Sequence, residues 1–282
     1  MRKINTLIIP DVHCRDFWRK PVYDTLSNHP ESDIVFLGDY LSPYPFEWDG
    51  YDTFTGTWDN KLRKECLDNG FEYLKEIIDL KKQNPERIHL LVGNHDGCCI
   101  GPLSVCECRY DYENQGRNIS LYCKNQEQFQ ICFQKKIGGK DFLFSHAGIT
   151  DGWLKSHDLK ADNICDFINN KYFLSFKDDE EYLQFWALMK EMSYSRGGYD
   201  RYGSLIWADV NEHYFELSNP DFESKLNYVQ VFGHTYLKNF AINLKNQRYC
   251  VDLRTAFYCD DEGNVKYYDN NEIVLDYFAL KK

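Results

Sequence analysis

The sequence predicts an α/β protein in which two packed, mixed β-sheets are flanked by helices. In the first third of the chain, short apolar runs alternate with a long amphipathic segment, which is typical of parallel strands joined by helices. A glycine-centred hairpin pattern and a series of short strand-like runs follow in the second half. A parallel half followed by a mixed or antiparallel half predicts two sheets packed face to face, with the helices outside.

The first three strand-like runs are INTLIIP (4–10), DIVFLG (33–38) and RIHLLVG (87–93). They are nearly continuous in aliphatic residues, as expected for strands that are buried on both faces. The segment 60–83 lies between the second and third runs. It repeats apolar residues at helical spacing and is rich in helix-forming residues, so it predicts an amphipathic helix. This order of elements implies parallel pairing of the strands.

The pattern changes after residue 130. The stretch QICFQKKIGGKDFLFSHAG (130–148) predicts two strands around a Gly138-Gly139 turn. Residues 150–200 are mostly helical in pattern and charged. Short strands are then expected at 227–234, 240–245, 247–253, 264–269 and 272–278.

No internal repeat or Pro/Gly-rich linker divides the chain. Its 282 residues exceed the usual size of a domain, but single α/β domains of this length are ordinary. We therefore expect one domain over residues 1–282. Its expected insertions are loops near 40–58 and 97–118 and a mostly helical stretch near 150–200.

The net charge and the lengths of the apolar runs disfavour some classes of function. The net charge of −11 and the pI near 5.2 disfavour binding to a long nucleic acid, because an acidic surface repels polyanions. No apolar run approaches the roughly 20 residues needed to span a bilayer. The run 4–10 is followed by Asp11 and His13 instead of a small-residue cleavage site, so it predicts a first strand and not a signal peptide. We expect a cytoplasmic protein with no membrane partner.

Eleven cysteines are many for such a protein. Thiols in the cytosol stay reduced, so disulfides are not expected. The densest group is Cys98, Cys99, Cys106 and Cys108. Its spacing is not that of the usual structural zinc site, which has two C-x-x-C-like pairs. We expect free thiols there, with a metal site as the alternative.

Polar side chains recur where the predicted strands end. The first strand ends in Asp11-Val12-His13, and alternate side chains of an extended chain share a face, so this carboxylate and imidazole can point at one ion. Later strand ends carry Gly38-Asp39, Gly93-Asn94-His95-Asp96, Ser145-His146-Ala147-Gly148 and Gly233-His234-Thr235. Ligands bind beyond the carboxyl ends of such strands. A mixed set of oxygen and imidazole donors suits Mn, Fe or Zn, and it is large enough for two ions that share a carboxylate.

These blocks, in this order, resemble the calcineurin-like metallophosphoesterases, whose pattern runs D-x-H, G-D, G-N-H-D or G-N-H-E, an isolated H, and G-H. The matching blocks span residues 11 to 235. Within that family, GSLIWADV (203–210) resembles the L-L-W-S-D stretch of phosphoprotein phosphatases, and FSHAGIT resembles the histidine-glycine block of their bacterial relatives. The resemblance implies a four-layer α/β/β/α fold and a metal-dependent phosphoric ester hydrolase.

The resemblance also implies a role for each residue. One metal would be held by Asp11, His13 and Asp39. The second would be held by Asp39, Asn94, His146 and His234, with Asp39 bridging the pair. The two divalent ions, Mn first and Fe or Zn as alternatives, would activate a water for in-line attack on a phosphoryl group. His95 would serve as the general acid.

Four positions depart from the pattern of the phosphoprotein phosphatases or their relatives. Tyr236 replaces the second histidine of G-H-x-H, which phosphoprotein phosphatases also lack. Ser42 and Pro43 stand where those enzymes have an aspartate that orients the acid and an arginine that holds phosphate, and Val92 replaces another arginine. Arginine forks bind phosphate oxygens in pairs, so other arginines are expected to supply this contact. The candidates are Arg15, Arg196 and Arg201.

The loop 40–58, YLSPYPFEWDGYDTFTGTW, is very rich in aromatic residues and directly follows Asp39. Long loops of this kind are usually functional, so it is a candidate substrate rim, with a self-packed loop as the alternative. The segment 97–118 is a second candidate rim.

Three functions are compatible with these features. The leading hypothesis is a phosphomonoesterase acting on a phosphoprotein or a small phosphate ester. The alternative is a phosphodiesterase or nucleotide pyrophosphohydrolase on a small nucleotide, which the aromatic loop and the missing arginines favour. A degenerate binding scaffold on the same fold is disfavoured, because all six ligand positions and His95 are present.

Overall fold

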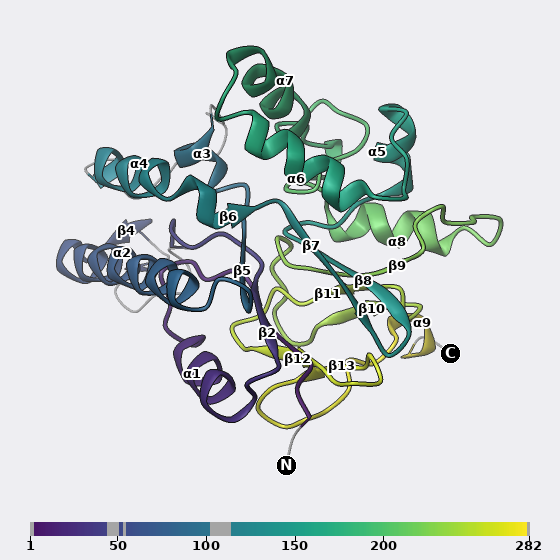
Figure 1. Cartoon of the computed structure of the whole chain (residues 1–282), viewed down its shortest axis with the longest axis horizontal. Helices are drawn as coiled ribbons and strands as arrows, with labels where there is room; N and C mark the ends of the chain where they lie inside the picture. The colour runs from purple at the N-terminus through teal and green to yellow at the C-terminus, as the bar shows by residue number, and fades with distance from the viewer. Residues whose placement is uncertain (1–2, 44–50, 53–54, 102–113, 281–282) are drawn as a thin grey trace.

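The computed structural model of the chain describes residues 3–43, 51–52, 55–101 and 114–280 (Figure 1). Two mixed β-sheets with helices around them confirm the predicted fold class. A short hairpin, β3 (Tyr51–Asp52) and β4 (Thr57–Trp58), lies apart from both sheets. None of the helices in the described ranges is long and apolar enough to cross a membrane.

The first sheet has the strand order β13-β12-β1-β2-β5-β6. Its strands are β1 (Thr6–Ile9), β2 (Asp33–Phe36), β5 (Ile88–Leu91), β6 (Phe129–Gln130), β12 (Phe257–Cys259) and β13 (Val265–Tyr267). Strands β1, β2, β5 and β6 are parallel neighbours, as the sequence predicts. Strand β12 joins β1 in the antiparallel direction, so the end of the chain returns to the first sheet.

The second sheet has the order β10-β11-β9-β8-β7. Its strands are β7 (Cys132–Ile137), β8 (Lys140–Ser145), β9 (Tyr228–Phe232), β10 (Ile242–Leu244) and β11 (Arg248–Cys250). Strands β7 and β8 form the predicted hairpin around Gly138-Gly139. Strands β8, β9 and β11 are parallel, so the ends of β8 and β9 face the same way.

The prediction of a strand at 272–278 is wrong. Val274 is buried between the exposed residues Ile273 and Leu275. The backbone of this segment, however, makes only a single bridge to β13 and a single bridge to β10, at the edges of the two sheets, and α9 (Tyr277–Leu280) then begins. Strand β12 was not predicted.

Helices cover the outer faces of both sheets (Figure 1). Their bounds are α1 (Arg19–Asn28), α2 (Asn60–Gln83), α3 (Gly97–Ile100), α4 (Gln115–Lys124), α5 (Asp151–Ser156), α6 (Ile164–Leu174), α7 (Asp179–Met189) and α8 (Val210–Ser218). Helix α2 coincides with the predicted helix, and the side chain of Asp59 caps its first turn. Helices α1 and α2 pack on the first sheet, and α6 and α8 pack on the second.

The core follows the two-residue period of the strands. Alternate residues of β1 and β2, such as Ile8 and Val35, pack between the sheets against Phe144 and Val231. Their sequence neighbours, such as Ile9 and Phe36, belong to the larger core under the helices. The two sheets therefore pack face to face. This packing holds the ends of β1, β2, β5, β8 and β9 along one edge of the molecule.

One close contact ties helix α2 to the end of β1. A Cβ atom at Gly70 would lie 2.3 Å from Cys14 Sγ and 3.0 Å from Cys14 Cα, so only glycine fits there. Gly70→Ala is expected to lower the free energy of unfolding by about 1–3 kcal/mol through overpacking, measured by equilibrium denaturation in urea.

Gly116→Ala in α4 is the matched control. A Cβ atom at this helical glycine meets nothing within 4 Å, so the substitution is expected to stabilise the protein by up to about 1 kcal/mol through helix propensity. Equal effects of the two substitutions would contradict the packing argument.

Candidate functional site

Five strand ends converge on one buried cluster of polar side chains. Its first half consists of Asp11 and His13 after β1 and Asp39 after β2. His13 Nε2 lies 3.6 Å from Asp39 Oδ2 and 4.0 Å from Asp11 Oδ2. Each of the three offers one ligand atom, and these atoms lie within 4.8 Å of one another. This spacing lets one ion contact all three.

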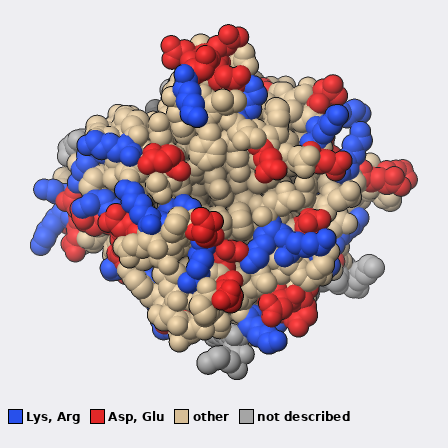
Figure 2. Space-filling model, viewed as in Figure 1, with Lys and Arg blue, Asp and Glu red and all other residues tan. Residues whose placement is uncertain are grey.

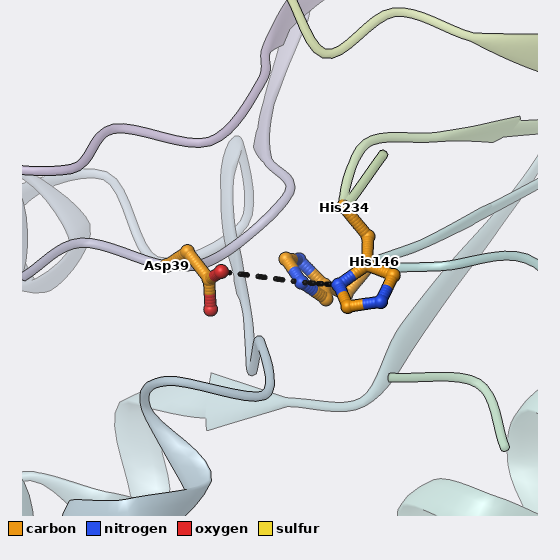
Figure 3. A group of neighbouring side chains, drawn as sticks. All are labelled: Asp39, His146 and His234. Carbon is orange, nitrogen blue, oxygen red and sulfur yellow. Dashed lines mark hydrogen bonds and ion pairs between the residues drawn. The ribbon is translucent and has the colours of Figure 1, made fainter. Parts of the chain in front are cut away.

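The second half shares Asp39 with the first (Figure 3). His146 Nε2 lies 3.4 Å from Asp39 Oδ2 and 3.2 Å from His234 Nδ1. The side-chain oxygen of Asn94 lies 2.9 Å from both of these ring nitrogens. Asp39, His146 and His234 form a second group whose ligand atoms lie within 4.8 Å of one another. The structure therefore brings together all six residues expected as metal ligands.

Unusual backbone conformations turn these side chains inward. His13, Asp39 and His234 all have left-handed backbone, with φ of 44°, 51° and 65°. Non-glycine residues rarely adopt this region, and each instance costs of order 1–3 kcal/mol unless the surroundings impose it. Three of the six candidate ligands share this strain, which is thus concentrated at the candidate site.

Glycines let the two carboxylates sit against neighbouring backbone. A Cβ atom at Gly93 would lie 2.1 Å from Asp39 Oδ1, and one at Gly233 would lie 2.0 Å from Asp11 Oδ1. Any side chain at these positions would push a carboxylate out of place. The glycines beside the polar residues at the strand ends are therefore part of the site.

Backbone carbonyls orient two of the imidazoles. Nδ1 of His13 lies 2.8 Å from the carbonyl oxygen of Ser42, and Nδ1 of His146 lies 2.8 Å from that of Leu37. Carbonyls only accept hydrogen bonds, so Nδ1 carries the proton in both rings and Nε2 presents its lone pair to the site. Ser42, which replaces the acid-orienting aspartate of the related pattern, thus contributes its carbonyl to the placement of His13.

Asp96 organises the site without facing it, a role that its place in the motif did not reveal. Its carboxylate accepts hydrogen bonds from the backbone N–H groups of Asp39 (2.7 Å), Gly93 (2.8 Å) and Tyr40 (3.2 Å) and from the hydroxyl of Tyr122. One buried carboxylate therefore fixes the ends of β2 and β5 against each other. Only the fold brings these donors together.

The electrostatics of the cluster favour a cation. Burial, followed by neighbouring carboxylates, raises the pKa of Asp11 and Asp39 well above the usual range. Burial lowers the pKa of His13 and His234 well below the usual value, and lowers the pKa of His146 to about 3. The imidazoles are therefore neutral and able to bind a metal. Buried carboxylates beside neutral imidazoles and an amide oxygen make a donor set that fits divalent ions such as Mn, Fe or Zn.

His95 lies at the mouth of the cluster. Its side chain is 19% exposed, and Nε2 lies 4.0 Å from Asp39 Oδ2. Its backbone N–H donates to Asp39 Oδ1 at 2.9 Å, and its ring meets the ring of His13 edge-on at 5.3 Å. His95 is thus held beside the shared carboxylate, with part of its ring open to solvent.

The three candidate arginines occupy different places. Arg196 is closest to the second half: its Nη2 donates to the carbonyl of His234 (3.0 Å) and to Thr235 Oγ1 (2.7 Å), and its Nε pairs with Asp209 Oδ2 (2.8 Å). Arg15 is half-buried near His13, whose pKa its charge lowers. Arg201 is exposed and lies over the ring of Tyr202.

Other parts of the related motifs border the cluster. Trp207 of the LIWAD stretch meets the ring of His234 edge-on at 5.6 Å, and Asp209 of the same stretch pairs with Arg196. Tyr236, at the position of the missing histidine, is 43% exposed, with the guanidinium of Arg254 5.9 Å above its ring.

The two candidate rims are only partly described. Residues 44–50 and 53–54 of the aromatic loop, and residues 102–113 of the second rim, lie outside the described residues. These include Cys106 and Cys108. Cys98 and Cys99 are free thiols in α3. In the part of the chain that the structure describes, the groups suited to a metal ion contain no cysteine.

Comparisons with known proteins agree with this geometry. The model of the calcineurin-like phosphoesterase family matches residues 4–238. A Caenorhabditis elegans protein named "Putative serine/threonine-protein phosphatase" is 26% identical over 149 residues, which are 51% of this chain and 32% of that protein. The chain thus spans about a third of the length of this curated relative.

A solved structure shares the fold. The cold-active protein-tyrosine phosphatase of a psychrophilic Shewanella species superposes with a TM-score of 0.53 and 18% identity, covering 98% of this chain and 81% of that one. The family match runs from β1 past His234, and so contains every residue of the cluster. The chain belongs to the calcineurin-like phosphoesterase family.

Proposed function

We propose that the protein is a phosphatase that uses two divalent metal ions, with manganese favoured, to hydrolyse phosphate monoesters. The observation that carries this proposal is the pair of ligand groups that share Asp39. A carboxylate common to two groups is the arrangement that a dinuclear centre requires. Asp11, His13 and Asp39 would hold one ion, and Asp39, Asn94, His146 and His234 would hold the other.

The bound ions would supply Lewis acidity, which polarises phosphoryl oxygens and lowers the pKa of a water. The chain itself supplies the remaining functions. His95, next to the shared carboxylate and partly open to solvent, would give a proton from its ring to the leaving oxygen of the ester.

Arg196 is the best-placed group for binding phosphate. Its guanidinium is already fixed by Asp209, the His234 carbonyl and Thr235. Its charge reaches the cluster, because it lowers the pKa of both His234 and His146. No described residue hydrogen-bonds its Nη1. A guanidinium held rigid in this way loses little entropy when it binds an anion.

The substrate class is proposed as a phosphoprotein or a small phosphate ester. The name of the curated relative supports the phosphoprotein. A long nucleic acid is not expected, because acidic and basic groups are interspersed over the face in Figure 2 and the net charge is −11.

The reaction class is tested by assays with Mn²⁺ on three substrates: a phosphoserine peptide, a simple aryl monoester and an aryl diester. We expect hydrolysis of the monoesters and slow or absent hydrolysis of the diester. Preference for the diester would overturn the monoesterase proposal in favour of a phosphodiesterase.

His95→Asn tests the acid. Asn keeps a polar side chain but cannot act as a general acid. We therefore expect kcat on the phosphoserine peptide to fall about 10²- to 10⁴-fold while both ions stay bound. The loss should be smaller on an aryl ester, whose leaving group needs little protonation. An equal loss on both substrates, or loss of metal by elemental analysis, would assign His95 to assembly of the site instead.

Arg196→Ala tests the phosphate contact, with Arg201→Ala as its matched control. Loss of a charged hydrogen bond costs about 1.5–3 kcal/mol, so Arg196→Ala should lower kcat/KM roughly 10- to 100-fold and weaken competitive inhibition by orthovanadate. The exposed Arg201 should have almost no effect on either measure. The reverse ranking would move the phosphate contact to the other arginine.

A further inference from the structure

Helix α8 lies behind the two histidines of the second half of the site. Two of its groups contact the loops of these histidines directly, and its N-cap residue does so through Arg196. The N-cap residue Asp209 pairs with Arg196, which holds the His234 carbonyl, and the N–H of Val210 donates to Thr235 Oγ1 at 3.1 Å. One turn into the helix, the ring of His213 contacts the loop of His146. This helix was not predicted from the sequence, although Asp209 and Glu212 form a capping box at its start.

His213 is a buried histidine that is not a metal ligand. Its Nε2 lies 3.0 Å from the carbonyl oxygen of Ala147, and its Nδ1 lies 3.1 Å from Arg248 Nη1. Arginine only donates hydrogen bonds, so Nδ1 must accept and Nε2 must carry the proton. The ring is therefore held in one tautomer and donates to the backbone directly after His146.

The same ring also touches the strand that leads to His234. It stacks on Phe232, the last residue of β9, with the ring centroids 4.5 Å apart. A Cβ atom at Gly148 would lie 2.7 Å from two ring atoms of His213, and Gly148 has a φ of 81°. The His146 loop thus folds tightly around the imidazole, which fills the space between the two loops.

A buried ion-pair network fixes His213 in turn. Arg248, 1% exposed, pairs with Asp151 at 2.9 Å and with Glu216 at 2.7 Å. Glu216 lies three residues after His213, on the same face of α8, and accepts from the backbone N–H of Gly152 at 2.8 Å. Breaking such a buried network would leave a charge without its partner, so the network is rigid.

We propose that His213 is a positioning residue for the second metal-binding half, which it serves through Ala147 and Phe232 without touching a ligand atom. The proposal rests on the dinuclear site proposed above. It assigns to α8 the task of holding His146 and His234 at the spacing at which both can bind one ion. In other metal sites, groups that hydrogen-bond the ligands themselves change metal affinity typically 10- to 100-fold, and His213 would act one step further out, through the backbone next to His146.

Two substitutions separate the contacts of the ring. In His213→Gln the side-chain amide reaches the place of Nε2 and can still donate to Ala147. In His213→Asn the shorter amide reaches only the place of Nδ1, so it keeps the contact with Arg248 and loses the one with Ala147. Equilibrium dialysis against Mn²⁺ with elemental analysis gives the affinity of each ion, and thermal unfolding of the metal-free proteins gives stability.

We expect His213→Asn to lower the affinity for the second ion roughly 10- to 100-fold and to leave the affinity for the first nearly unchanged. The affinities of His213→Gln should be close to those of the wild type. His89→Asn is the matched control, because His89 is a largely buried histidine that stacks on Phe133 and lies near Asp33, and among the described residues its ring contacts no candidate ligand. It should lower the unfolding temperature and keep both ions.

The inference is overturned if His213→Asn keeps both affinities, if His213→Gln loses as much as His213→Asn, or if His89→Asn loses the second ion equally. If His213→Asn does not fold, Gly148→Ala, which crowds the same ring, should weaken the second ion selectively, and an unchanged affinity would overturn the inference. If the wild type takes up no second ion, both the dinuclear proposal and this inference fail. If the wild type takes up two ions but the variants do not behave as expected, only this inference fails.

Discussion

The structure depends on the burial of the Asp39 carboxylate between two sets of neutral imidazoles. An unpaired buried charge is costly in a protein interior, and here Asp11 and Asp96 add further carboxylates nearby. The cluster meets part of this cost with hydrogen bonds from backbone N–H groups to Asp11, Asp39 and Asp96. Bound cations would remove the remaining cost at the candidate site.

The two-sheet architecture explains how chain segments far apart in sequence meet at Asp39. Parallel strands in both sheets end along the same edge, and three of the candidate ligands there have left-handed backbone. Behind them lies a layer of groups that never face the site: carbonyls at Leu37 and Ser42, and the carboxylate of Asp96. The two carbonyls set which nitrogen of His13 and of His146 points at the candidate site, and Asp96 fixes the backbone beside Asp39.

Much of this arrangement could be predicted from the sequence, because short local sequence patterns indicate it. Aliphatic runs that end in a polar residue, often beside glycine, mark both a strand and a candidate ligand, and β1, β2 and β5 follow them closely. Contacts between distant segments leave no such signal. The bonds from Asp96 to the end of β2, the pairing of Arg196 with Asp209, and the contact of α8 with the His146 loop exist only once the chain has folded. The segment 272–278 shows the opposite failure, a strand pattern whose partners lie in two different sheets.

The most direct test of the shared carboxylate is the manganese content of Asp39→Asn compared with that of Asp11→Asn, after equilibrium dialysis and with folding verified by circular dichroism. If Asp39 belongs to both ligand groups, Asp39→Asn should lose affinity for both ions, whereas Asp11→Asn should lose affinity for one. Retention of two ions by Asp39→Asn, or the same single loss in both variants, would contradict a centre built around one common carboxylate.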